Sequence, residues 1–154
     1  MIYDTYIREK VFSKLNDIVN DGDVNGLYFE DKFIPVFDEY VNPNITIPVV
    51  RGASTYIILQ DQSEQFSAIQ NVCNVVFDLS LTIRIVTKFG TVGGKKLSED
   101  IGREVINRIM TKRGDSKIEG IKRVELINST SYSEQSKTNL AFSKILILNF
   151  IKNG

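Results

Sequence analysis

The segment from Val75 to Phe89 alternates between apolar and other side chains more regularly than any other part of the chain. The six side chains of one set are Val75, Phe77, Leu79, Leu81, Ile83 and Ile85, and those of the other are Val76, Asp78, Ser80, Thr82, Arg84 and Val86. A period of two predicts an antiparallel strand with one face on a core and the other in water. Such a strand extends about 40 Å. We therefore expect it to protrude from its own domain as a hairpin arm.

Two segments have the spacing of amphipathic helices. The first, Tyr6 to Val19, places Ile7, Val11, Phe12, Leu15 and Ile18 on one stripe. The second, Leu97 to Lys112, does the same with Leu97, Ile101, Val105 and Ile109. Each stripe predicts a helix with one buried face. Ser98 is the expected N-cap of the second helix.

The remaining apolar segments are short and read as strands. They are Leu27–Phe29, Phe33–Phe37, Tyr56–Gln60, Ile121–Asn128 and Leu140–Ile151. Polar loops are expected at Asp61–Asn74, Gly90–Lys96 and Ser129–Asn139. The predicted fold class is α+β, with a mainly antiparallel sheet of about four strands and two amphipathic helices packed on one face. A single domain over residues 1–154 is expected, with 22–55 as an irregular, loop-rich insertion.

Charge is balanced over the whole chain but not along it. The formal net charge is zero, yet residues 1–64 hold 5 basic and 11 acidic side chains, and residues 95–123 hold 9 basic and 5 acidic. Two differently charged solvated surfaces explain this pattern, and so does a head-to-tail contact between subunits. A protein that wraps DNA over its whole surface is not indicated.

The residue types that are absent exclude several kinds of chemistry. The chain has no histidine and one cysteine, Cys73, so His-based zinc sites, Ser/His/Asp triads and an intrachain disulfide are all excluded. Neither a signal peptide nor a membrane-spanning run is evident, which predicts a protein made in a reducing cytoplasm with no membrane partner.

The candidate motifs for catalysis or cofactor binding do not have the spacing or the residue types that such sites need. The loop Gly90–Lys96 lies between a strand and a helix, where a phosphate-binding loop belongs, but only three residues separate Gly90 from Gly94 and Lys96 stands where a Ser or Thr is needed. The adjacent carboxylates Glu30/Asp31, Asp38/Glu39 and Glu99/Asp100 diverge on a strand or a helix. We expect no enzyme, no catalytic residue, no metal and no cofactor.

This layout resembles the tail-completion and tail-terminator proteins of the head–tail junction, or neck, of tailed bacteriophages. The resemblance is carried by the Tyr56-Ile-Ile-Leu59 strand, the polar segment Gln60–Gln65, the long strand Val75–Lys88 and the helix Lys95–Met110. It implies an antiparallel sheet with flanking helices and a homo-oligomeric ring, six- or twelvefold, that joins or caps the portal, neck and tail. The acidic, loop-rich segment Gly22–Ala53 departs from the pattern.

The function predicted from this resemblance is that of a structural virion protein of the head–tail junction, present in the host cytoplasm during assembly. Its partners would be copies of itself, a portal or neck ring protein and tail proteins. The residues predicted to contact neighbouring subunits or partners are Asp61, Gln62, Glu64, Gln65, Gly93, Gly94, Lys95 and Lys96, and those predicted to face channel DNA are Lys88, Lys95 and Lys96. The alternatives are another tail component, such as a tube or hub protein, and a small cytoplasmic ligand-binding domain or enzyme.

Overall fold

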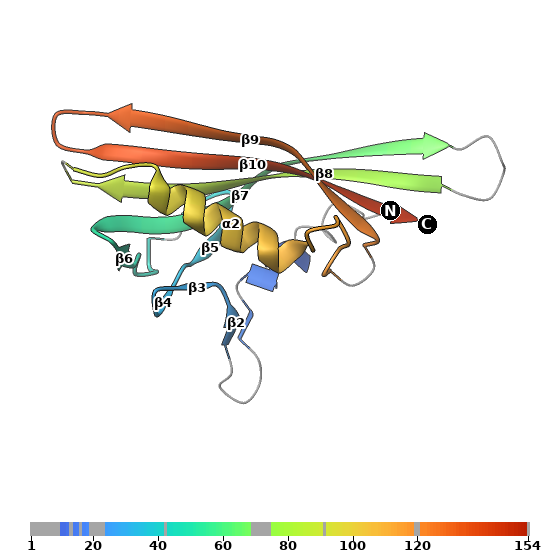
Figure 1. Ribbon diagram of the computed structural model, residues 1–154, viewed down its shortest axis with the longest axis horizontal. Coiled ribbons are helices and arrows are strands. Elements are labelled where there is room, and N and C mark those ends of the chain that lie inside the picture. Colours follow the sequence, from blue (N-terminus) through green and yellow to red (C-terminus); the bar gives the residue numbers. More distant parts are fainter. Residues whose placement is uncertain are drawn as a thin grey trace.

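The fold is dominated by four long strands that pair side by side (Figure 1). The computed structural model describes residues 10–12, 14–15, 17–18, 24–41, 43–68, 75–90, 92–118 and 121–153, and of these the backbone alone for 17–18, 24–26, 62–68, 75–78 and 152–153. The long strands are β7 (Ala53–Ala68), β8 (Val75–Phe89), β9 (Arg123–Gln135) and β10 (Leu140–Asn153).

The central strand is β8, which pairs along almost its whole length on both sides. It runs antiparallel to β7, from Ala53 opposite Phe89 to Ala68 opposite Val75, and antiparallel to β10, from Leu140 opposite Phe89 to Asn153 opposite Val76. The sheet order is β5–β7–β8–β10–β9, with β6 also pairing with β7. Since β9 pairs only with β10, it forms one edge of this six-stranded sheet.

Short strands fill the chain before β7. They are β1 (Asp17–Ile18), β2 (Val24–Gly26), β3 (Tyr28–Phe29), β4 (Lys32–Phe33), β5 (Val36–Asp38) and β6 (Val49–Val50). Two of their hairpins turn through residue pairs with positive φ, Glu30–Asp31 and Arg51–Gly52, as type I′ turns require. Arg51 also pairs with Glu30 at 2.7 Å and Asp100 at 3.1 Å, which joins the β3–β4 turn to the helix α2.

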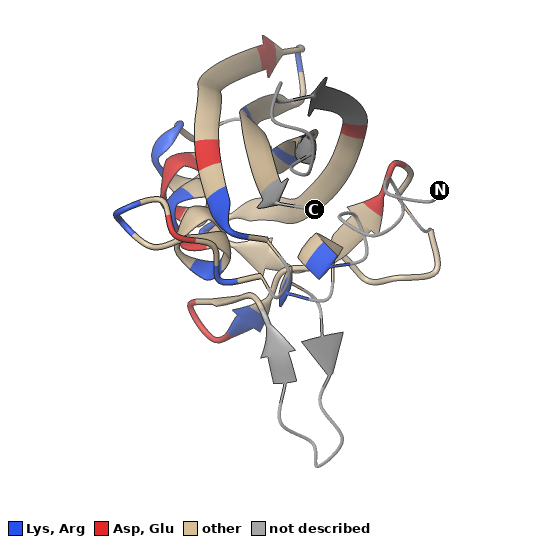
Figure 2. Ribbon diagram, turned by 90° about the vertical axis from the view of Figure 1, so that its right-hand side faces the viewer, with Lys and Arg blue, Asp and Glu red and all other residues tan. Residues whose placement is uncertain are grey.

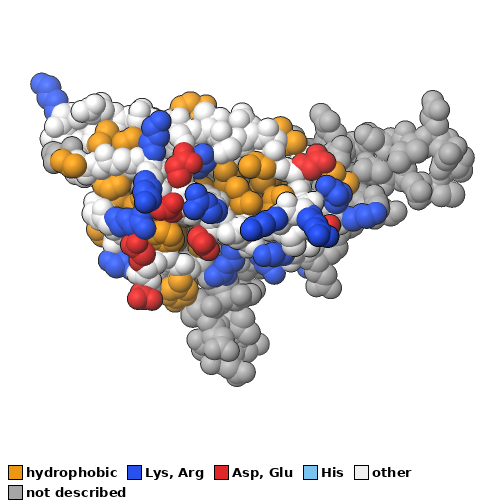
Figure 3. Space-filling model, in the orientation of Figure 1, with side chains coloured by type: hydrophobic (Ala, Val, Ile, Leu, Met, Phe, Trp, Pro, Cys, Tyr) orange, Lys and Arg blue, Asp and Glu red, His pale blue; other side chains and the backbone are white. Residues whose placement is uncertain are grey.

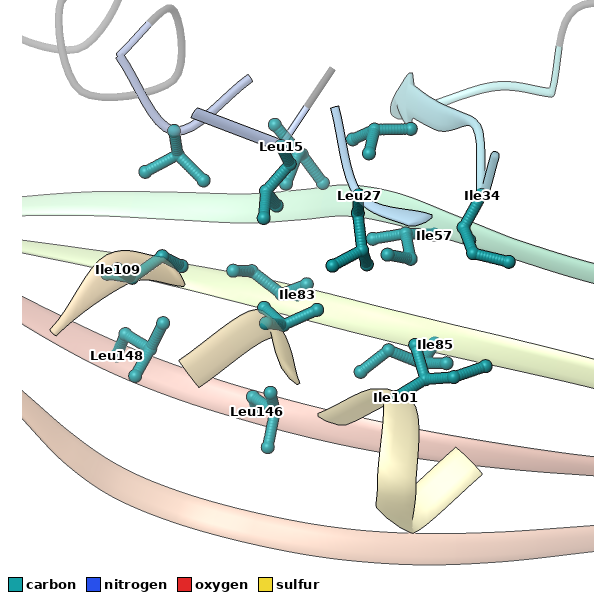
Figure 4. Close-up of a cluster of buried hydrophobic side chains, with 14 of the residues drawn as sticks. Leu15, Leu27, Ile34, Ile57, Ile83, Ile85, Ile101, Ile109, Leu146 and Leu148 are labelled. Carbon is teal, nitrogen blue, oxygen red and sulfur yellow. The ribbon is translucent and has the colours of Figure 1, made fainter. Parts of the chain in front are cut away.

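The main core lies between the sheet and the helix α2 (Lys96–Ile109). Ile101 and Ile109 of α2 pack toward Ile83 of β8 and Leu146 and Leu148 of β10 (Figure 4). This side of the sheet is called the helix face below, and the other side the far face. The helix face needs every second residue of β8 to be apolar, which is the alternation seen in the sequence.

The segment 22–55 contributes directly to this core. Leu27 and Ile34 are fully buried in the same cluster as Ile57 of β7 (Figure 4). Two residues of the N-terminal helical segment, Val11 and Leu15, are also fully buried there. The backbone amide of Leu27 donates to the carbonyl of Leu15 at 2.8 Å, so the two segments are joined by main chain as well as by packing.

The predicted α+β fold class is wrong, because the molecule is mostly β. The main sheet has six strands rather than about four, and strand residues far outnumber helical residues in the described chain. The predicted first helix is helical at 10–12 and 14–15 but has ended before Asp17, where β1 pairs with β2. Its residues 6–9 lie outside the described ones.

Two predicted loops are largely strand. Residues 61–68 belong to β7 and residues 129–135 to β9, because hydrogen-bonded neighbours stabilise these polar sequences as strands. Residues 69–74 lie outside the described chain. The strand predicted at Val75–Phe89 is confirmed as β8. The second helix starts one residue earlier than predicted and ends at Ile109, and its N-cap is Lys95 rather than Ser98, whose buried hydroxyl donates to the Lys95 carbonyl at 2.8 Å.

Replacing Ile101 by alanine tests the docking of α2. Ile101 is completely buried, so Ile101→Ala should lower the free energy of unfolding by about 2–5 kcal/mol in urea denaturation. The matched control is Arg103→Ala on the exposed side of the same helix, expected to change stability by under about 0.5 kcal/mol. Equal effects of the two substitutions would contradict this packing.

Candidate interaction surfaces

Three turns of the sheet meet at one end of the molecule, on the left of Figure 1. They are the β6–β7 turn at Arg51–Gly52, the segment 90–95 before α2, and the β9–β10 turn at 136–139. The register brings them together, because Phe89 pairs with both Ala53 and Leu140. The Gly90–Lys96 loop, which holds four of the predicted contact residues, therefore lies at the same end as the other two turns.

A hollow between these turns has a row of paired residues as its floor. Val49, Ser54, Lys88, Ala141 and Glu134 follow one another across five strands, and all of them line the hollow. The row lies on the far face, since Lys88 Nζ sits 5.5 Å from the ring centre of Tyr56, which belongs to a small far-face cluster. Because the row contains both a lysine and a glutamate, the charges that line the hollow are not of one sign.

The three lysines predicted to face DNA do not form one patch. Lys88 is on the far face, whereas Lys95 and Lys96 are exposed at the start of α2, which covers the helix face. Facing DNA thus remains a prediction for each lysine separately.

Position 93 requires glycine because of close packing and not because of its backbone conformation. A Cβ atom there would lie 2.3 Å from Cγ of Phe89, whereas one on Gly94 would meet nothing within 4 Å. Among the described glycines, positive φ occurs at Gly52 and Gly114 and not in this loop.

The predicted contact residues Asp61, Gln62, Glu64 and Gln65 lie on strand β7 and not on a loop. Asp61 is exposed and falls in a β-bulge, where Gln60 and Asp61 together face one residue of β8. Beyond the bulge, the backbones of Gln62, Glu64 and Gln65 pair with Leu81, Leu79 and Asp78. Gln60 and Asp61 line a shallow depression with Glu39 and Tyr40, so the bulge lies next to the end of β5.

The outer edge of β9 is a surface that the sequence did not reveal. At its start, the edge is closed by the Val124 amide, which donates to the Gly114 carbonyl at 3.0 Å, and by a bridge from Asp115 to Arg123. From Leu126 to Gln135, no segment of the described chain pairs with it. Leu126, Ile127 and Tyr132 are 40%, 59% and 54% exposed along this stretch. In the sequence, the Ser/Thr residues and Tyr132 of this stretch were the features that could have indicated a strand.

A polar network ties the start of α2 to the two strands beneath it. The Ser131 hydroxyl donates to Glu99 Oε1 at 2.7 Å, and Lys144 Nζ donates to Oε2 at 2.9 Å. The Ser131 hydroxyl first, and then Lys144, hold the pKa of Glu99 below its ordinary value. The network fixes α2 over β10 and β9, and β9 carries the open edge.

The described residues contain no group of His, Cys, Asp and Glu side chains that could hold a metal ion. None of the described helices is long and apolar enough to cross a membrane.

Comparisons with known proteins include a weak structural likeness. No family model matches the sequence, and no curated protein matches it. A solved structure described as the virion of a native gene transfer agent particle contains a similar chain, with a TM-score of 0.46 and 12% identity over 77% of this chain and 78% of that chain. Similarity at this level does not identify a family.

Substitution of Gly93 tests the close packing of the Gly90–Lys96 loop. Gly93→Ala should lower the free energy of unfolding by about 1–3 kcal/mol, because its Cβ collides with the buried Phe89 ring. Gly94→Ala is the matched control, with an expected change under about 0.5 kcal/mol. Thermal and urea unfolding of both variants would measure this, and equal stabilities would contradict it.

The Glu99 network predicts a dependence of stability on pH. Because the folded-state pKa lies below the ordinary value of 4.5, the stabilisation by ionised Glu99 is complete above that value and is lost as the pH falls through the lowered pKa. Glu99→Gln should therefore cost up to about 1 kcal/mol at neutral pH, and the difference from the wild type should shrink in acid. Glu104→Gln on the same helix is the control. A difference between Glu99→Gln and the wild type that is independent of pH would contradict the assignment.

Proposed function

We propose that this protein is a structural virion protein of the head–tail junction of a tailed bacteriophage or a phage-like particle, and that it forms a homo-oligomeric ring. The observation that carries the proposal is the outer edge of β9, a long row of backbone groups left unpaired within the described chain from Leu126 onward. Unpaired edges of this length promote pairing with other chains unless they are protected.

The other edge of the main sheet is different, which suits a ring. It is built by the short strands β5 and β6, and β7 continues past Leu59, the last residue that pairs with β5. Contact between two different edges is heterologous, and heterologous contacts close into rings when the rotation allows. A two-fold dimer would instead use the same edge twice.

The sequence resemblance supplies the biological setting of the proposal. It links the order of a Tyr-Ile-Ile-Leu strand, a long alternating strand and an amphipathic helix to proteins that join heads to tails. The residues predicted there as contacts are divided between the bulge region of β7 and the turn end of the sheet, so they support contacts at two separate surfaces.

A variant with two lysines on the β9 edge tests the assembly. We expect the wild-type protein to form closed rings in negative-stain electron microscopy and ultracentrifugation, and Leu126→Lys with Ile127→Lys to shift it to monomers. Both side chains are exposed, so thermal unfolding should stay near that of the wild type.

Val92→Lys is the matched control, since Val92 is 84% exposed in the loop at the opposite end of α2. Loss of rings in this variant alone would indicate that the Gly90–Lys96 loop, and not the β9 edge, makes the subunit contact. A wild-type protein that stays monomeric at high concentration would overturn the ring. Antibody labelling of assembled particles would then test the position, because label along the tail rather than at the neck contradicts a junction role.

A further inference from the structure

The two edges of the main sheet carry opposite charge. On the β9 side, five basic side chains follow α2, and we call them the basic edge: Lys112, Arg113, Lys117, Lys122 and Arg123. On the β5 side, three acidic side chains lie at the end of β5 and in the bulge of β7, and we call them the acidic edge: Asp38, Glu39 and Asp61.

Backbone bonds gather the basic edge into one patch. Met110 bridges to Ser116 and Asp115 bridges to Arg123, which folds the segment after α2 back onto the start of β9. The Arg123 guanidinium lies against Gly114, where a Cβ would be 3.1 Å from it. Figure 3 shows Lys and Arg side chains along α2 and around the segment that follows it.

The basic edge is not neutralised by its own chain. Within the part of the chain that the structure describes, none of its five side chains forms an ion pair with a carboxylate. Asp115 is the one described acidic residue in the segment between α2 and β9. All five basic side chains are exposed, so they are available to an acidic surface.

The acidic edge has its own local geometry. β5 ends at Asp38, the Glu39 amide still donates to the Leu59 carbonyl at 2.9 Å, and a positive φ at Glu39 then turns the chain away from the sheet. The turn leaves Tyr40 82% exposed beside Asp61. Within the described chain, Glu39 and Asp61 form no ion pair. Tyrosine is one of the residue types enriched at the centre of protein contacts.

The register places the basic edge near the end of the sheet opposite the three turns and the acidic edge level with the middle of β8. Arg123 aligns through Ile151 with Asp78 of β8, and Asp38 aligns through Leu59 with Ile83. The two levels are at most about 17 Å apart along the strands. In the end view of Figure 2, Lys and Arg lie at the left and centre together with Asp and Glu, whereas the charged residues on the right are Asp and Glu.

We propose that the basic edge of one copy binds the acidic edge of the next copy, and that this pairing fixes the direction and the partner of the subunit contact. The inference rests on the proposed ring and names the residues that make its contact. A second copy is favoured over nucleic acid because the chain has no net charge and itself carries the complementary acidic surface.

Charge reversal on each edge is the test, with assembly measured by ultracentrifugation and electron microscopy. Lys112→Glu with Arg113→Glu should weaken assembly about tenfold or more, and so should Glu39→Lys with Asp61→Lys. The chain that carries all four substitutions should recover assembly, since the two substituted pairs have exchanged sign and again carry opposite charges. Wild-type assembly should be stronger at about 0.05 M than at about 0.5 M NaCl, because salt screens exposed charges.

Arg103→Glu with Lys137→Glu is the matched control, with the same change of charge at exposed positions that lie on neither edge. Thermal unfolding should show that every variant is folded. The proposal is overturned if the reversals leave assembly unchanged, if the four-substitution chain stays dissociated, or if Lys112→Glu with Arg113→Glu weakens only binding to duplex DNA.

The outcomes separate this inference from the proposed function. Rings that persist in all the variants overturn the charged contact and leave the ring standing. Open filaments that the reversals disrupt support the charged contact and contradict the closed ring. A wild-type protein that never self-associates overturns both.

Discussion

The structure depends on the pairing of β8 with β7 on one side and β10 on the other. Because β8 is paired along nearly its full length, it fixes the register of both neighbours, and β10 in turn fixes β9. One face of β8 supplies Leu81, Ile83 and Ile85 to the core beneath α2. The position of the helix, and the identity of the two sheet edges, both follow from this strand.

The elements predicted best are those that bury one face, because their apolar residues then recur at a regular spacing in the sequence. The alternation in β8 and the stripe of α2 were visible because each element buries a single side over many residues. The second half of β7 and most of β9 gave no such signal, since polar residues such as Gln62, Glu64 and Ser129 are held in strands by their neighbours rather than by burial. Strand formation of this kind depends on the partner strand, which the local sequence does not contain.

Bulges added a second difficulty. At Gln60–Asp61 in β7 and around Ile127 in β9 the pairing shifts by one residue, which interrupts any regular alternation. Of the candidate site, the uneven charge along the chain was visible in the sequence, but the grouping of Lys112 with Arg123, and of Asp61 with Glu39, required the fold. Gly93 is similar, because the reason for glycine there is the ring of Phe89 above it.

The zero net charge has a consequence for growth of the proposed assembly. Each added copy contributes as many positive as negative charges, so an assembly of any size accumulates no electrostatic repulsion. An unfinished assembly always keeps one basic and one acidic end, which attract a further copy or each other. Growth of this kind has no limit of its own, so the number of copies is set by the angle between neighbours at which the last free end meets the first.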